Sequence, residues 1–436
     1  MICLMVFALF SSLILTRRVF NIRSATIMAS SVNDPGSNPK MMESNEDASS
    51  NRIRLAVTGD FMIGRGIDAI MPNHVDGVLY ESYMKHARHY VEIAEKVNGP
   101  LPKKEIQDQG CAYIWGDLLA ELNANPPDCF IVNLETALTT NEKPYPKSIN
   151  YRCHPANVEC LTVAGVHVAT LANNHVLDWG SEGLVESIVT LEKAGVLFAG
   201  AGRNNDEART PTEYTCKTSN ACVRIAAVGF PTAGVPLDWS AGGTHTSGVH
   251  VYEHASAAVA QKIAKSFGTQ NKEEDAGGKE CIKVASLHWG PNWGWGTPAE
   301  HRKFAHALID AGVHVVIGHS SHHVKGLEVY KGCLIAYGLG DFLNDYEGIV
   351  GQGYELFRDD LSCLYMPFIN SKTGKLIRLD IIPLKIHNLR VNRLTNPDDI
   401  EWLRYTFSRE GAVLGTECET YRDVLGNINL RISWKE

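Results

Sequence analysis

Five apolar runs in this chain each lead into a residue that can bind a metal ion, and this arrangement constrains the fold more than any other feature. The residues that follow the runs are Asp60, Glu135, Asn174 with His175, His288, and His319 with His322. Runs rich in Val, Ile, Leu and Ala predict buried β-strands. Because the carboxyl ends of parallel strands open onto one crevice, we expect these side chains to converge there. Their mixed oxygen and nitrogen donors favour one or two divalent ions, with Mn, Zn and Fe as candidates.

The order of the predicted elements favours a layered α/β fold. We expect strands at residues 54–58, 129–134, 167–171, 281–287 and 314–318. We expect helices at residues 80–98, 114–122, 181–194, 254–267, 298–311 and 398–408. Residues 361–394 alternate between apolar and polar positions like antiparallel strands. Strand–helix alternation followed by antiparallel strands predicts a layered α/β/α core.

The amino-terminal segment has two interpretations. Residues 2–15 form an apolar run as long as a signal-peptide core and too short to span a bilayer, and Arg17, Arg18 and Arg23 follow it. That order is typical of a signal anchor with a cytoplasmic body. A start at Met28 would instead give a soluble amino terminus. We expect a cytoplasmic body, with a membrane-anchored or secreted protein as the alternative.

The chain divides into four predicted segments. Residues 1–23 are a signal anchor or a non-native leader, and residues 24–51, rich in Ser, Asn and Asp, are a disordered linker. Residues 52–394 form the main domain, and residues 395–436 form an extension that packs on it.

Composition limits the partners of the protein. The formal net charge of −8 and the absence of a basic stripe argue against a nucleic-acid partner. An acidic chain can still take an anionic substrate, since a bound metal supplies local positive charge. The eleven cysteines contain no CxxC pair, which excludes a disulfide scaffold. Cys216 and Cys222 flank a short segment, and their spacing alone does not decide whether they pair.

Each residue of the predicted crevice also has an interpretation in which it serves only the fold and binds no metal. Asp60 is a metal ligand or an Asx-turn residue, and Glu135 is a bridging carboxylate or an acid at a helix start. His175 acts as a general acid if it stays off the metal and as a ligand if it does not. A lone His288 is more often a core residue. The spacing of His319, His322 and His323 favours ligation.

Five further residues lie near this set in the sequence. The planar guanidinium groups of Arg65 and Arg152 suit a carboxylate or phosphate of the substrate, and surface arginines are the alternative. We expect Asp178, Asp341 and Asp345 to orient the metal ligands by hydrogen bonding to them, without binding the metal themselves. The acidic tract that contains Asp341 and Asp345 also fits a further cation site or a solvated loop.

The whole series resembles the capsule-synthesis CapA family, which includes poly-γ-glutamate biosynthesis proteins. The matching segments are GDFMIGR, NLET, YRCHPANV, LANNHVLDWG, the His288 block, and GHSSHH followed by GLEVYKGCLIAYGLGDF. The resemblance implies a four-layer αββα sandwich similar to calcineurin-like metallophosphoesterases, with two metal positions. It implies that Asp60, Glu135 and His322 serve one position, that Glu135, Asn174, His288 and His319 serve the other, and that His175 is the general acid.

This chain departs from the pattern at four places. Met62 stands where the phosphoesterases carry a histidine, and Glu135 replaces their bridging aspartate. Ser320 stands where many members have a second histidine. Asp341 lies in a segment that is commonly GNF, and it can compensate for the missing ligands.

The resemblance implies metal-assisted hydrolysis of a phosphoester or amide bond in capsule or poly-γ-glutamate metabolism, with His175 protonating the leaving group. The expected partner is an anionic small molecule or a polymer such as polyglutamate, with Arg65 and Arg152 gripping it. A membrane would be contacted only through the amino-terminal apolar segment. Two alternatives stay open: a non-catalytic accessory protein that binds an anionic polymer, and a general phosphoesterase.

Overall fold

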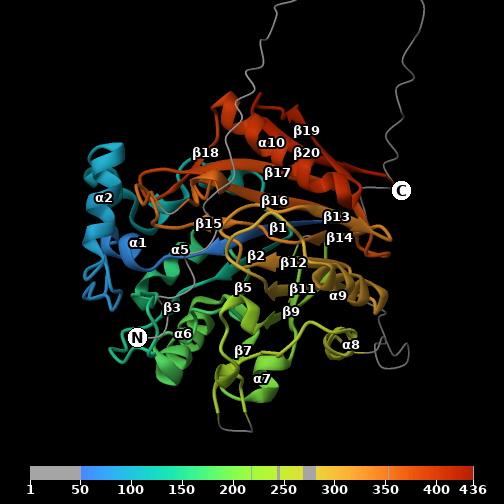
Figure 1. Cartoon of the computed structure of the whole chain (residues 1–436), viewed down its shortest axis with the longest axis horizontal. Helices are drawn as coiled ribbons and strands as arrows, with labels where there is room; N and C mark the ends of the chain where they lie inside the picture. Colours follow the sequence, from blue (N-terminus) through green and yellow to red (C-terminus); the bar gives the residue numbers. More distant parts are fainter. Residues whose placement is uncertain (1–50, 218, 243–245, 269–280, 352, 436) are drawn as a thin grey trace, which may run out of the picture. The chain divides into compact units, whose positions relative to one another are not determined.

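Two β-sheets form the body of the protein. The computed structural model describes residues 51–435 apart from 218, 243–245, 269–280 and 352 (Figure 1). The predictions for residues 1–50 lie outside the described residues. In the part of the chain that is described, no helix combines the length and the apolar character needed to cross a membrane.

The larger sheet is built around β1, with parallel strands on one side and antiparallel strands on the other. The parallel side runs outward from β1 (Arg52–Phe61) through β2 (Cys129–Leu134), β5 (Val168–Thr170) and β6 (Leu197–Ala199). The antiparallel side runs through β16 (Leu361–Asn370), β17 (Leu376–Ile386), β20 (Ile428–Trp434) and β19 (Thr416–Arg422). Two short strands add to it, β15 (Asp341–Leu343) beside β1 and β18 (Val391–Arg393) beside β17.

The smaller sheet has four parallel strands with an antiparallel strand at each edge. Its order is β13 (Leu327–Tyr330), β14 (Cys333–Ala336), β12 (Val315–His319), β11 (Cys281–His288), β9 (Cys222–Gly229) and β8 (Thr212–Thr215). Four two-residue strands pair outside both sheets: β3 (Ala137–Leu138) with β4 (Arg152–Cys153), and β7 (Ala201–Gly202) with β10 (Gly248–Val249).

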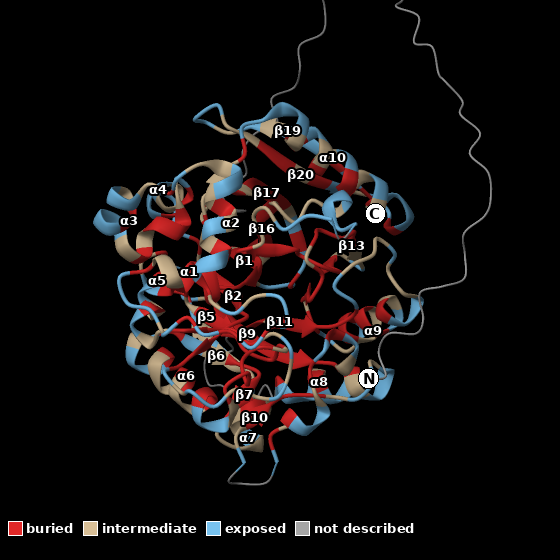
Figure 2. Cartoon of the chain, turned by 60° about the vertical axis from the view of Figure 1, so that its left-hand side comes forward, coloured by how far each residue is buried: buried red, intermediate tan, exposed pale blue. Residues whose placement is uncertain are grey.

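The two sheets pack face to face and helices cover their outer faces. Alternate strand residues fill the space between the sheets, among them Ile131, Ile225 and Ile381. The outer face of the larger sheet packs against α1 (Arg65–Ile70), α2 (Arg88–Asn98), α3 (Lys103–Gln109), α4 (Leu118–Ala124), α5 (Glu159–Thr162) and α6 (Gly180–Ala194). The outer face of the smaller sheet packs against α8 (Ala257–Ser266) and α9 (Ala299–Asp310). The strands are mostly buried, and exposed residues gather on the helices (Figure 2). The predicted four-layer αββα sandwich is confirmed.

The carboxyl-terminal segment adds a helix and two strands to this core. Helix α10 spans Pro397–Gly411, and the side chain of Asn396 caps it by accepting hydrogen bonds from the backbone N–H groups of Asp398 and Asp399. Strands β19 and β20 follow and extend the larger sheet beside β17. Sequence patterning did not predict these two strands. The remaining helix, α7, spans Asn205–Arg209.

The helix expected at residues 80–98 begins only at Arg88. The preceding segment is held by other contacts, because the buried side chain of Glu81 accepts hydrogen bonds from Arg65 and Tyr90. A backbone bridge between Val78 and His86 adds a second constraint. These contacts outweigh the local preference of residues 80–87 for helix.

A disulfide joins Cys222 to Cys281, which settles the question left open by the spacing: Cys222 does not pair with Cys216. Cys222 and Cys281 are register partners on the neighbouring strands β9 and β11, with Cα atoms 4.4 Å apart. The thiol of Cys216 instead donates a hydrogen bond to the carbonyl of Asp128.

Two isoleucines on β17 offer a test of the core between the sheets. Ile381 is fully buried there, whereas Ile377 lies at a register irregularity and is 46% exposed. We expect Ile381→Ala to lower the free energy of unfolding by about 2–5 kcal/mol, because it leaves a cavity. Ile377→Ala is the matched control and should change it by about 0.5 kcal/mol or less. Chemical denaturation measures both values, and equal losses would contradict the assignment.

Candidate metal centre

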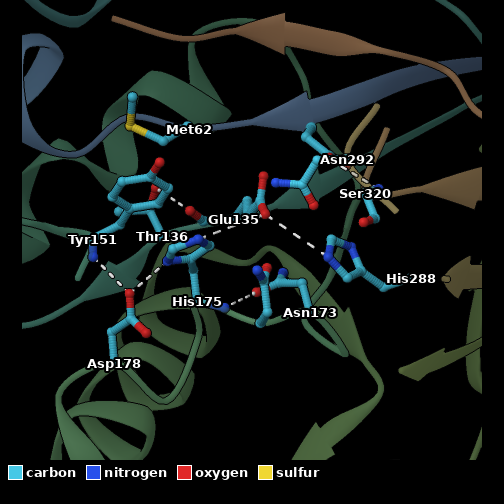
Figure 3. Close-up of polar contacts among 12 residues, drawn as sticks. Met62, Glu135, Thr136, Tyr151, Asn173, His175, Asp178, His288, Asn292 and Ser320 are labelled. Atoms are coloured by element: carbon cyan, nitrogen blue, oxygen red, sulfur yellow. Dashed lines mark hydrogen bonds and ion pairs between the residues drawn. The ribbon is translucent and has the colours of Figure 1, made fainter. Parts of the chain in front are cut away.

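The ends of five strands bring the predicted ligands together. Asp60 lies near the end of β1, Glu135 follows β2, His288 ends β11, His319 ends β12 and Asp341 begins β15. His288 and His319 are register partners, as are Asp60 and Asp341. Figure 3 shows the side chains of Glu135, His175 and His288 pointing toward one another. The convergence predicted from the apolar runs is therefore present.

Asp60 is held by donors from both sheets. Its Oδ1 accepts hydrogen bonds from Asn133 Nδ2 at 2.8 Å and from His319 Nδ1 at 3.0 Å. Its Oδ2 accepts one from the backbone N–H of Ser320 at 3.0 Å. Burial raises the pKa of this carboxyl group, but the hydrogen bond and charge of His319 outweigh it and lower the pKa to about 2. Asp60 is therefore a fixed anion.

A close backbone contact places Asp341 beside Asp60. The backbone N–H of Asp60 donates to the carbonyl of Gly340 at 2.9 Å. A Cβ atom on Gly59 would lie only 1.7 Å from that carbonyl oxygen. Glycine at position 59 is therefore required for β15 to approach β1.

Glu135 is a buried carboxylate close to two imidazole rings. Its Oε1 lies 3.9 Å from His288 Nε2 and 4.0 Å from His175 Nε2. Burial, together with the nearby charges of Asp60 and Asp341, raises the pKa of Glu135 well above its usual value. A nearby cation would favour the ionised form. The position of Glu135 therefore suits a metal ligand.

Several buried polar atoms of this cluster find no hydrogen-bond partner among the described residues. They are both ring nitrogens of His288, Nε2 of His319 and Oδ1 of Asn174. Buried polar atoms are nearly always paired, so such atoms at one place indicate a missing partner. Burial lowers the pKa of His288 to about 3, which keeps the ring neutral as ligation requires. The donor set fits a divalent metal ion.

Two groups of ligand atoms have the spacing of a metal site. In one, the atoms of Asp60, Glu135 and His288 lie within 4.8 Å of one another, and in the other the atoms of Asp60, His322 and Asp341 do. Asp60 belongs to both groups. The resemblance had implied that Glu135 is shared and that Asp341 can compensate for missing ligands. In the structure Asp60 is the residue common to both groups, and Asp341 belongs to one of them.

His322 is bound between an acid and an amide. Its Nδ1 lies 2.9 Å from Asp341 Oδ1, and its Nε2 lies 3.0 Å from Asn292 Nδ2. Burial lowers the pKa of this imidazole, but the charge of Asp341 outweighs burial and raises it. The amide of Asn344 donates to Asp341 Oδ2 at 2.8 Å and fixes the carboxylate.

His175 lies at the edge of the cluster in a network that includes a residue the sequence analysis missed. Its Nδ1 lies 2.6 Å from Asp178 Oδ2, and its ring stacks on Tyr151 with centroids 3.8 Å apart. Lys147 Nζ lies 2.6 Å from Asp178 Oδ1, 3.2 Å from His175 Nδ1 and in contact with the carbonyl of Asn174. Lys147 stands in a polar loop without a motif, so no sequence signal identified it.

The two asparagines before His175 have different roles. Asn173 Oδ1 accepts hydrogen bonds from the backbone N–H groups of His175 and Val176, and its amide donates to Asn133 and to the carbonyl of Leu134. Asn173 therefore fixes the turn. Asn174 is left with its side-chain oxygen available for a ligand.

Arg65 and Arg152 are both engaged within the protein. The guanidinium group of Arg65 is buried and ion-paired with Glu81 and Asp345. Arg152 pairs with Asp76 and donates to the carbonyl of Asn141. Asp345 thus supports Arg65 rather than a histidine. Substrate binding by either arginine stays a prediction.

Comparisons with known proteins identify the family to which this chain belongs. The family described as bacterial capsule synthesis protein PGA_cap matches residues 54–346, a range that includes both ligand groups. The chain belongs to this family.

Two relatives and one solved structure show how similar the chain is to individual proteins. A protein of Mycobacterium tuberculosis named "Probable polyglutamine synthesis accessory protein" is 37% identical, over 86% of this chain and 95% of its own length. The "Capsule biosynthesis protein CapA" of Bacillus anthracis is 23% identical, over 77% of this chain and 68% of its own length. Among solved structures, a phosphatase of Mycoplasma pneumoniae is 15% identical with a TM-score of 0.39, over 80% of this chain and 97% of that chain.

The shared position of Asp60 predicts a graded loss of metal. We expect Asp60→Asn to weaken binding in both ligand groups by at least about 100-fold, since even residues behind a ligand contribute 10–100-fold to affinity. Asp341→Asn should weaken binding in one group only. Equilibrium dialysis with Mn²⁺ or Zn²⁺ and elemental analysis measures the stoichiometry, with the exposed Asp108→Asn as control. Wild-type metal content in Asp60→Asn would refute the shared position.

Proposed function

We propose that this protein is a metal-dependent hydrolase that acts on a capsule-type or poly-γ-glutamate-type polymer. The observation that carries the proposal is the cluster of buried carboxylates and unpartnered imidazole nitrogens beside the His175–Asp178 pair. The names of the relatives support the polymer class, since they refer to capsule and polyglutamine synthesis.

The two ligand groups would hold the metal. Asp60, Glu135 and His288 would bind one ion, and Asp60, His322 and Asp341 a second, with His319 orienting Asp60 through its Nδ1. Asn174 offers a further oxygen to this crevice. A bound divalent ion supplies positive charge that polarises a carbonyl or phosphoryl oxygen of the substrate.

His175 would move the proton. With its Nδ1 proton donated to Asp178, its Nε2 faces Glu135 and the crevice. Burial first, and then the charges of Lys147 and Arg65, lower the pKa of this imidazole well below its usual value. The neutral ring would therefore accept at Nε2 the proton that the attacking water loses, and would then give that proton to the leaving amine or alkoxide. Asp178, Lys147 and Tyr151 fix the ring in this orientation.

A non-catalytic accessory role is the second candidate, and the word "accessory" in the name of the mycobacterial relative favours it. The two candidates differ in one observable. A hydrolase shortens the polymer or releases phosphate, whereas an accessory protein binds the polymer and leaves it intact.

Replacing His175 separates catalysis from metal binding. We expect His175→Gln to lower kcat by about 10²–10⁴-fold, because it removes the proton carrier, and to leave the metal content unchanged. Turnover is measured on poly-γ-glutamate by chain length and on aryl phosphates by product release. The exposed His74→Gln is the matched control. Full activity in His175→Gln would refute its role, and a wild-type protein that binds polymer without turnover would favour the accessory function.

Removing the metal should destabilise the protein as well as inactivate it. Chelation would leave Glu135 and Asp60 as buried neighbouring carboxylates without a cation between them. We expect the loss of a ligand present at 100 times its Kd to lower the free energy of unfolding by about 2.7 kcal/mol. Thermal denaturation before and after chelation measures the shift, and re-addition of Mn²⁺ or Zn²⁺ should restore Tm and turnover together. An unchanged Tm and unchanged turnover would contradict a resident metal.

A further inference from the structure

An aromatic cavity of about 540 Å³ lies beside the ligand cluster. Six aromatic side chains line it: Tyr83, Tyr90, Tyr151, Trp293, Tyr346 and Tyr354. Two contacts join it to the candidate metal centre. His322 lines the cavity and belongs to one ligand group, and the ring of Tyr151 stacks on His175. The cavity therefore adjoins the proposed reaction site.

The lining of the cavity carries negative charge. Arg65 is the one arginine or lysine among its described lining residues, and it faces the two carboxylates of Glu81 and Asp345, so this trio has a net negative formal charge. Glu355 and Asp359 add two more acidic groups to the lining. Burial, together with the charges of Asp341 and Asp360, raises the pKa of Asp359 to about 7, so Glu355 carries most of this added negative charge at neutral pH. A run of polymer carboxylates inside this cavity would be repelled by these acidic groups.

The inner rings of the cavity already bind a cation. The guanidinium carbon of Arg65 lies 4.0 Å from the ring centroid of Tyr90, 4.7 Å from that of Tyr151 and 5.6 Å from that of Tyr346. Aromatic faces attract cations through the ring quadrupole, and cages of such rings recognise ammonium groups. The inner half of the cavity thus already binds a cation through its aromatic rings.

The outer rings have no such partner. Tyr83 is 64% exposed and Tyr354 is 41% exposed, and Trp293 stacks on Tyr354 with centroids 4.3 Å apart. No arginine or lysine of the described residues lies over any of these three rings, within the range at which the inner rings hold Arg65. Trp293 also stacks on His323, so the exposed rings of Tyr83 and Tyr354, beside the carboxylate of Glu355, are the groups available to an organic cation.

We propose that the outer half of this cavity binds an ammonium group of the substrate. The inference rests on the proposed function in one respect: when the ammonium group is bound in the cavity, the bond to be cleaved would lie beside the metal ligands, on the side of His322 and Tyr151. The part of the substrate that this cavity would bind is an amine-bearing or alkylammonium-bearing group, such as the free amino end of a chain, and not an internal stretch of carboxylates.

The test compares a cation with a neutral molecule of the same shape. We titrate the full chain with choline and with its carbon isostere, in which carbon replaces the nitrogen, and follow binding by ligand-observed NMR before and after chelation of metal. We expect choline to bind about tenfold more tightly than the isostere in both states. Glutarate, titrated after chelation, should bind no better than the isostere. Equal binding of choline and isostere, or preferred binding of glutarate, would overturn the proposal.

Variants locate the binding to this cavity. Tyr83→Leu removes an exposed ring and should weaken choline binding by about threefold, whereas Tyr83→Phe keeps the ring and should bind like wild type. Glu355→Gln should also weaken binding, with the exposed Glu253→Gln as the matched control. Wild-type affinity for choline in both Tyr83→Leu and Glu355→Gln would place the binding elsewhere and refute the assignment.

The outcomes separate this inference from the proposed function. A preference for choline in a protein that hydrolyses nothing would keep the ammonium site and refute the hydrolase. Hydrolysis by a protein that does not distinguish choline from its isostere would keep the hydrolase and refute the ammonium site.

Discussion

The structure around the site depends on the hydrogen bonds that Asp60 accepts. Asn133 comes from the larger sheet, whereas His319 and Ser320 come from the end of the smaller sheet, so one carboxylate joins the two sheets at their carboxyl edges. The same residue donates its backbone N–H to Gly340, which places β15 and Asp341. Because these contacts fix three strand ends at once, the spacing of both ligand groups follows from the position of a single side chain.

Electrostatics divides the acidic residues of the site into two kinds. The hydrogen bond and charge of His319 lower the pKa of Asp60, whereas burial and like charge raise that of Glu135 well above its usual value. A protein interior tolerates the second kind only with a compensating charge or a bound proton. Arg65 supplies that charge for Asp345 within the protein. For Glu135 the compensating charge would be the metal ion.

The sequence predicted features that local patterning controls and missed those that depend on distant contacts. The apolar run at residues 129–134 placed β2 at its observed bounds, and the ligand residues after the runs identified the crevice. The family resemblance implied the four layers. The partners of Arg65 could not be predicted, because Asp345 lies 280 positions away in the chain. The pairing of Cys222 with Cys281 and the shared position of Asp60 likewise depend on strand register, which no short motif encodes.

The carboxyl-terminal hairpin affects how copies of this protein can associate through the edge of the larger sheet. Without β19 and β20, most of β17 would be the rim of the larger sheet, with unpaired backbone groups that can recruit a strand from another molecule. The hairpin replaces that rim with β19, whose exposed Glu417 and Glu419 oppose such recruitment. Residues 416–434 therefore place two exposed carboxylates on this edge of the larger sheet, at a place remote in sequence from every ligand of the crevice.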